Sequence, residues 1–174
     1  ALVATLGLVV AAVAGTTTLA GLALGIGLEP VSAEGATGDY YTNYKGKGEA
    51  TVSAFKNGAD FVFTHVEAPD ECGHDGDCEL KVKSIEKIDA EILAPVKKYL
   101  DGCGEDYRIL LMPDHPTPIE ARTHVIAPVP YVIYGAGINE KSGLPYSEKD
   151  AEKTGKHEAF AYNLMGRFIG KEEK

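Results

Sequence analysis

Five acidic and imidazole side chains have the types and spacing of metal ligands. Asp70 and His74 stand four positions apart, Asp114 and His115 are adjacent, and His124 follows nine positions later. Each group comes just after an apolar run that predicts a buried strand, so we expect all five at one edge of an open α/β sheet. Oxygen and nitrogen donors without thiolate favour Mn, Zn or Mg, and two groups predict two divalent metal ions. The pattern indicates a dinuclear hydrolase or transferase.

Simpler roles for the same residues have to be weighed. A single Asp or His is more often a cap, a turn former or a hydrogen-bonded polar group than a ligand, but five such residues at strand ends favour ligation. The Asp-x-x-x-His spacing puts both side chains on one side of a tight loop or a first helical turn. Cys72 and Cys78, beside His65 and His74, suggest a zinc knot, yet their spacing is poor for one.

Composition narrows the class of protein. The chain has 174 residues, 44% hydrophobic and 25% charged, which suits one globular domain with a sizeable core. Its net charge is -9, and no Lys/Arg stripe is present, so a nucleic-acid partner is excluded. Three cysteines without a C-x-x-C pair favour reduced thiols and a cytoplasmic location.

The first 28 residues form a run without a charged side chain, and this run is long enough for a membrane span. Three threonines at positions 16–18, recurring glycines and the lack of a basic flank before Lys45 argue against one. We therefore expect a buried strand over residues 2–10 and a glycine-broken helix over 16–25, both in the core, and no membrane partner.

The rest of the chain alternates between strand and helix patterns. A helix over 43–57 has Ala50, Val52 and Phe55 as its apolar face, and a helix over 78–100 is kinked by Pro95. The remaining elements are strands over 60–66, 107–112 and 129–134 and a closing helix over 158–169. This alternation predicts an α/β fold whose mainly parallel sheet has helices on both faces.

Three motifs in order resemble one family. They are Glu34-Gly-Ala-Thr-Gly with Thr42-Asn-Tyr44-x-Gly-Lys47, Asp60 to His74 followed by Leu80-Lys81, and Leu111-Met-Pro-Asp114-His115-Pro-Thr-Pro with Arg122-Thr-His124. Together they resemble the compact, archaeal-type 2,3-bisphosphoglycerate-independent phosphoglycerate mutases, members of the alkaline phosphatase superfamily. The resemblance runs from about residue 27 to the C-terminus.

The resemblance implies roles for individual residues. Asp70, His74 and His124 correspond to the ligands of one ion, and Asp114 and His115 to part of the set for the other. In the family an Asp near the N-terminus and a Ser or Thr nucleophile complete the second set, and nothing in residues 1–28 matches them. Residues 1–174 therefore resemble the C-terminal portion of an alkaline-phosphatase-like domain, without the nucleophile segment and the inserted substrate domain. The missing N-terminal segment would be the partner of this chain.

The resemblance also implies an activity. The complete enzyme would interconvert 2-phosphoglycerate and 3-phosphoglycerate through a phosphoenzyme, and we expect this chain alone to be inactive. Arg122 would bind the substrate phosphate or form a salt bridge at the rim; the sequence favours neither. Two other functions stay open: a phosphomonoesterase or other phosphotransferase of the same superfamily, and a non-catalytic fragment.

Overall fold

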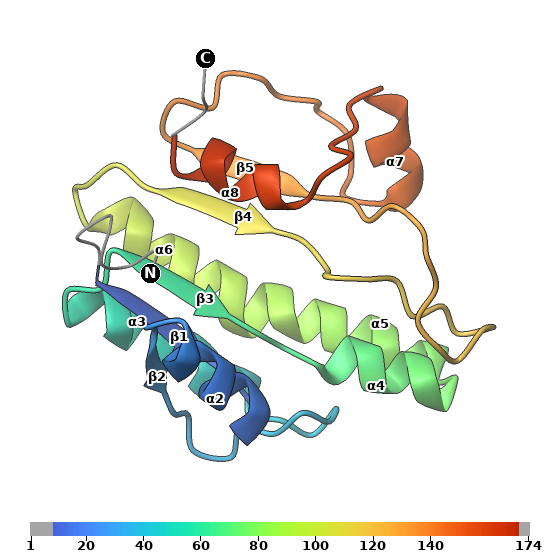
Figure 1. The fold of residues 1–174 in the computed structure, drawn as a ribbon, viewed down its shortest axis with the longest axis horizontal. Helices are drawn as coiled ribbons and strands as arrows, with labels where there is room; N and C mark the ends of the chain where they lie inside the picture. Colours follow the sequence, from blue (N-terminus) through green and yellow to red (C-terminus); the bar gives the residue numbers. More distant parts are fainter. Residues whose placement is uncertain (1–8, 171–174) are drawn as a thin grey trace. The chain divides into compact units, whose positions relative to one another are not determined.

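The computed structural model describes residues 9–170, which form two compact units (Figure 1). The first unit comprises the chain up to Gly104 together with Thr117–Thr123. The second comprises Glu105–Pro116 and the chain from His124 onward. The candidate ligands Asp70 and His74 belong to the first unit, and Asp114 and His115 belong to the second.

The first unit is built on a parallel sheet of three strands in the order β2-β1-β3 (Figure 1). The strands are β1 (Val10–Val13), β2 (Glu29–Val31) and β3 (Phe61–Thr64). All four residues of β1 are buried, as expected for the middle strand of a parallel sheet. The register pairs Val13 with Thr64, so β1 and β3 end together and their following loops share one edge. The expected α/β fold with a parallel sheet is confirmed.

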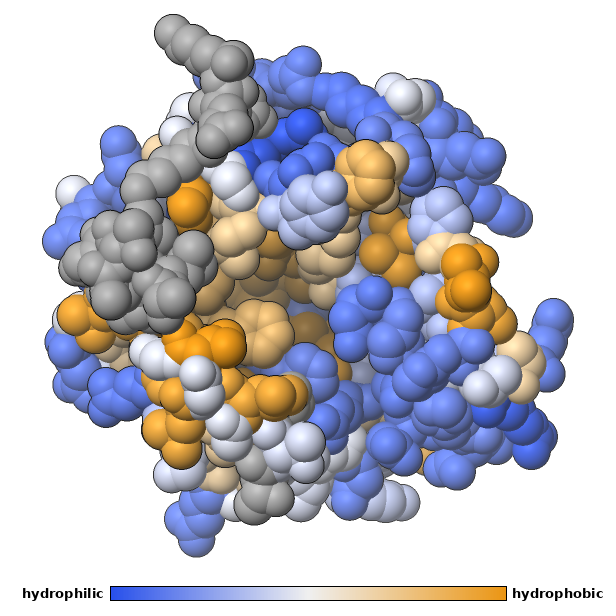
Figure 2. Space-filling view, viewed as in Figure 1, coloured by the Kyte–Doolittle hydropathy of each residue, from blue (hydrophilic) through white to orange (hydrophobic). Residues whose placement is uncertain are grey.

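The apolar N-terminal segment is less buried than its sequence predicts. Most of the expected strand over 2–10 lies outside the described residues, and β1 begins at Val10. Helix α2 (Thr17–Gly25) forms as predicted, but its residues Leu22 and Leu24 and the following Ile26 are 61%, 63% and 59% exposed. Figure 2 shows this surface as an orange patch over α2. The prediction that α2 belongs to the core is therefore wrong, and Ala23 is its one buried residue among those whose burial is described.

No helix in the described part of the chain is long and apolar enough to cross a membrane.

Helix α3 (Tyr44–Lys56) forms where the sequence predicts it, with a different inner face. The side chain of Asn43 caps the helix by accepting a hydrogen bond from the Gly46 amide at 2.8 Å. The expected apolar residues Ala50, Val52 and Phe55 are half-buried, and Phe55 stacks on Tyr99. The buried positions recur every three or four residues and include two polar side chains: Tyr44, Lys47, Gly48, Thr51 and Ala54.

The expected helix over 78–100 is continuous but changes its winding. It consists of α5 (Cys78–Lys87), the π-helical segment η1 (Ile88–Leu93) and α6 (Ala94–Gly102). Pro95 has no amide hydrogen for the carbonyl of Glu91 four positions earlier, and a π turn next to it accommodates that loss. The Glu91 carbonyl lies 2.4 Å from where a Cβ on Gly48 would stand, so the glycine lets α3 pack closely on η1. The change of winding thus occurs next to Pro95, and a kink at this residue stays a prediction.

The core of the first unit lies beside this contact. Tyr44 of α3, Ala68 and Ile92 are buried together, with Val66 and Ile88 packed against them. Ala68 opens α4 (Ala68–Asp75), the helix that carries Asp70 and His74. The ligand-bearing helix is therefore fixed directly to the core.

The second unit contains an antiparallel pair of strands, β4 (Arg108–Leu111) and β5 (Val132–Gly135), at the positions that the sequence predicts. The closing helix is shorter than expected: α8 spans Tyr162–Phe168, and Phe160 lies exposed before it. A further helix, α7 (Glu148–Lys153), is capped by Ser147, whose side chain accepts a hydrogen bond from the Asp150 amide. It carries no buried residue, so no apolar period marks it in the sequence.

Candidate metal centre

Asp70 and His74 occupy one face of α4. Pro69 lies in the first turn of this helix, where its missing amide hydrogen costs nothing, and Gly76 ends it with a φ of 73°. The four-residue spacing brings Asp70 Oδ2 to 3.4 Å from His74 Nε2. The prediction that the two side chains lie on the same side is confirmed, with Asp70 in the first turn of the helix and His74 in its last.

Two contacts orient these side chains. The Thr117 hydroxyl donates a hydrogen bond to Asp70 Oδ1, which leaves Oδ2 as the oxygen beside His74. On the other side, His74 Nδ1 lies 3.0 Å from the carbonyl oxygen of Arg122. Since a carbonyl only accepts, Nδ1 carries the hydrogen in this contact, and in the neutral imidazole Nε2 then holds the lone pair. Both candidate ligand atoms therefore face the same point.

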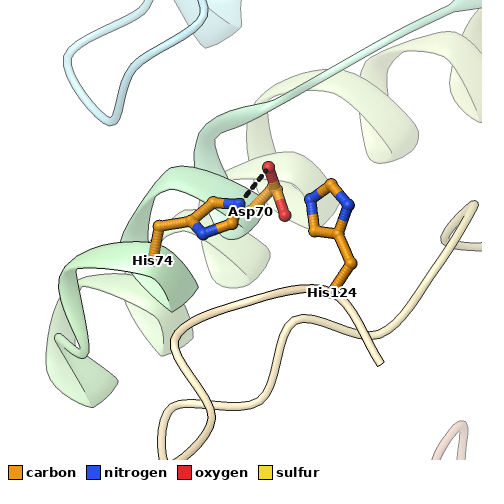
Figure 3. Close-up of side chains that lie close together, drawn as sticks. All are labelled: Asp70, His74 and His124. Carbon is orange, nitrogen blue, oxygen red and sulfur yellow. Dashed lines mark ion pairs between the residues drawn. The ribbon is translucent and has the colours of Figure 1, made fainter. Parts of the chain in front are cut away.

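His124 completes a group of three. It directly follows Thr123, the end of the segment that packs in the first unit. One ligand atom each from Asp70, His74 and His124 lies within 4.8 Å of the others, and Figure 3 shows the Asp70 carboxylate between the two imidazole rings. Two ligands bound at about 2.0–2.1 Å in tetrahedral geometry stand about 3.3 Å apart. The 3.4 Å between Asp70 and His74 fits this spacing, and the N₂O donor set suits a divalent ion.

The other two predicted ligands, Asp114 and His115, lie in the second unit. Asp114 Oδ2 lies 3.4 Å from His115 Nε2, with the Asp114 side chain 70% exposed. The His115 ring lies against the His124 ring, with 3.8 Å between their centroids. The group identified in the described residues comprises Asp70, His74 and His124, so Asp114 and His115 as ligands of a second ion stay a prediction.

Arg122 contributes through its backbone. It has a φ of 51°, a left-handed backbone conformation that residues other than glycine rarely adopt. This conformation directs the Arg122 carbonyl to His74. Its guanidinium lies against Gly76, where an added Cβ would stand 2.5 Å from Nε. A phosphate contact for this side chain stays a prediction.

Comparisons with known proteins place the chain in a family. A family model described as the metalloenzyme superfamily matches residues 2–163. The chain belongs to the metalloenzyme superfamily. Proteins from Methanosarcina acetivorans and Methanothrix thermoacetophila, both named 2,3-bisphosphoglycerate-independent phosphoglycerate mutase, are each 42% identical to it over 79% and 86% of its length. The resemblance that the motifs indicate is thus confirmed.

The metalloenzyme fold is confirmed by a solved structure. The PH0037 protein from Pyrococcus horikoshii aligns with 99% of this chain at a TM-score of 0.81 and 28% identity. The chain spans 52% of that protein, and 34% and 38% of the two archaeal mutases. These relatives are therefore longer than this metalloenzyme chain.

The metalloenzyme chain also has polar residues near the ends of β1 and β3 that sequence reasoning missed. The buried Lys47 ammonium donates to the carbonyl oxygens of Thr37 at 3.2 Å and His65 at 3.4 Å. Burial lowers the pKa of Lys47, while Glu67 and then Asp39 raise it. Thr117 was missed as well, and its signal was its place three residues after the Asp114 ligand motif.

Proposed function

We propose that this chain is the metal-binding, C-terminal portion of a longer cytoplasmic enzyme that interconverts 2-phosphoglycerate and 3-phosphoglycerate. The observation that carries the proposal is the convergence of Asp70, His74 and His124, in a chain 42% identical to proteins named as such mutases. Asp70 would stay ionised, and His74 and His124 would each offer a lone pair to one ion. Asp114 and His115 would supply part of a second set.

The reaction would need groups beyond these residues. When bound, divalent ions make a nearby hydroxyl easier to deprotonate and neutralise phosphoryl oxygens. A Ser or Thr nucleophile in the remainder of the longer protein would take the phosphoryl group and return it to the other hydroxyl of the glycerate. The residues of this chain would hold and orient the metal, and His115 of the second unit lies against His124.

Metal analysis tests the first step. The chain, loaded with Mn or Zn and desalted, should retain an ion that His74→Ala loses, because that substitution removes one of three ligands. His157→Ala is the matched control, since His157 is an exposed histidine outside the group. Elemental analysis that finds the same metal stoichiometry in His74→Ala and in the parent rejects the assignment.

A further inference from the structure

The segment that precedes His124 is fixed to the ligand helix by a residue that is not itself a candidate ligand. Thr117 is 4% exposed, and its hydroxyl donates to Asp70 Oδ1. Its carbonyl oxygen accepts a hydrogen bond of 2.6 Å from the Lys81 ammonium of α5. Thr117 is therefore held from both ends, by the helix that carries Asp70 and by the next helix.

A glycine in α4 makes this approach possible. A Cβ on Gly73 would stand 2.5 Å from the Thr117 carbonyl oxygen and 2.9 Å from Lys81 Nζ, closer than atoms can pack. Glycine inside a helix is otherwise unfavourable relative to alanine. Its presence beside His74 therefore leaves room for the close approach of Thr117.

We propose that Thr117 is a positioning residue for the metal centre, which orients the Asp70 carboxylate so that Oδ2 is presented to the ion. The inference rests on the proposed function, because it concerns how tightly the same three ligands hold a metal. A carboxylate with one oxygen fixed by a hydroxyl donor loses less rotational freedom on binding an ion than a free one. Such partners of metal ligands commonly change metal affinity by about 10–100-fold when removed.

Substitution of the hydroxyl tests the proposal. The probe is Zn²⁺ at fixed pH, titrated by calorimetry into the full 174-residue chain. Thr117→Val keeps the shape and removes the donor, so its Kd should rise by about 10–100-fold. Thr117→Ser restores the donor and should bring the Kd back to within about threefold of the parent, which a purely structural role of the methyl group would not do. Thr154→Val, at an exposed threonine of the second unit, is the control and should leave the Kd unchanged.

A second variant keeps the test valid if Thr117→Val fails to fold. Gly73→Ala favours the helix locally but displaces Thr117. It should therefore raise the Kd for Zn²⁺ while the helix content of the chain, measured by circular dichroism, stays at the parent's level. Equal Kd values for the parent, Thr117→Val and Gly73→Ala would overturn the positioning role while leaving the metal site intact. Failure of the parent to bind Zn²⁺ would overturn the proposed function itself, and this inference with it.

Discussion

Arg122 combines an unfavourable backbone with a useful contact. Among the described residues it is the one non-glycine residue with a positive φ, a conformation that costs about 1–3 kcal/mol. Its carbonyl accepts the hydrogen of His74 Nδ1, so the turn fixes the tautomer of a candidate ligand. Strain of this kind persists where surrounding contacts enforce it, here the contact of the side chain with Gly76 and the fixed position of Thr117.

Substitution at Arg122 separates its backbone role from its side chain. Arg122→Gly should retain the free energy of unfolding to within about 1 kcal/mol and keep the parent's Zn²⁺ affinity, since glycine adopts a positive φ freely. Arg122→Val should lose about 1–3 kcal/mol, because a β-branched residue is strained there. Urea unfolding measures the free energy of unfolding of each variant, and calorimetry measures its Zn²⁺ affinity. Loss of Zn²⁺ binding in Arg122→Gly would instead assign the contribution to the guanidinium.

Lys47 gives a prediction on pH. Burial lowers its pKa below the usual 10.5, so the folded chain releases this proton at a lower pH than the unfolded chain. The unfolded state binds more protons between the two values, and the contribution of Lys47 to stability therefore rises as pH approaches 10.5. Lys47→Met leaves the carbonyls of Thr37 and His65 without their donor and should lose about 1–3 kcal/mol at pH 7.

Comparing Lys47→Met with the parent separates the contribution of Lys47 to the pH dependence of stability from that of the tyrosines, which are present in both proteins. Their difference in unfolding free energy, measured in urea from pH 7 to 10.5, should widen toward the upper end. A difference that narrows with pH would show that the ammonium is stabilised by Glu67 and Asp39 more than it is penalised by burial.

At the scale of the elements, the close contact between α3 and η1 depends on Gly48. Replacing glycine by alanine inside a helix usually stabilises a protein by up to about 1 kcal/mol. Here an added Cβ would meet the Glu91 carbonyl at 2.4 Å, so Gly48→Ala should destabilise the chain by about 1–3 kcal/mol. Gly21→Ala in α2, where an added Cβ would meet nothing within 4 Å beyond its own helix turn, is the matched control and should stabilise the chain. Equal gains in urea unfolding for both variants would contradict the tight contact.

The elements themselves were largely predictable, and their burial was not. Alternating patterns located β3, β4, β5 and α3 because their apolar runs are bounded by turn residues. The inner face of α3 escaped prediction because Lys47 and Thr51 are buried polar residues that find partners only in the folded chain. The candidate ligands Asp70, His74 and His124 were predicted from residue type and strand ends, whereas the contact of Thr117 with Asp70 joins residues 47 positions apart in sequence.

At the scale of the whole molecule, the exposed apolar patch over α2 raises the question of membrane binding. The helix has nine residues, a rise of about 13.5 Å, while a bilayer core measures about 30 Å. A helix of this length is too short to span the bilayer, so we expect a carbonate wash, which removes surface-bound protein, to release the chain from liposomes, and Leu24→Glu to leave that result unchanged. Recovery of the parent with liposomes after a carbonate wash would contradict this expectation.

The length of the chain leads to the prediction on activity. It spans 34% and 38% of two mutases that it resembles, and the resemblance assigns the nucleophile and an Asp ligand to residues it does not contain. The threonines at positions 16–18 are poor substitutes, because the Thr16 hydroxyl already donates to Glu67 and no adjacent Asp-Gly ligand is present. Without a phosphoryl acceptor the covalent step cannot occur.

The test compares this chain with one extended upstream by the family's Asp and Ser segments, both supplied with Mn²⁺. Interconversion of 2- and 3-phosphoglycerate should appear with the extended protein and be nearly absent with the 174-residue chain. His74→Ala in the extended protein should abolish it, and His157→Ala should not. Release of inorganic phosphate without interconversion by the extended protein would favour a phosphomonoesterase. Full turnover by the 174-residue chain would contradict the assignment of the nucleophile to the missing segment and place it among the hydroxyls of this chain.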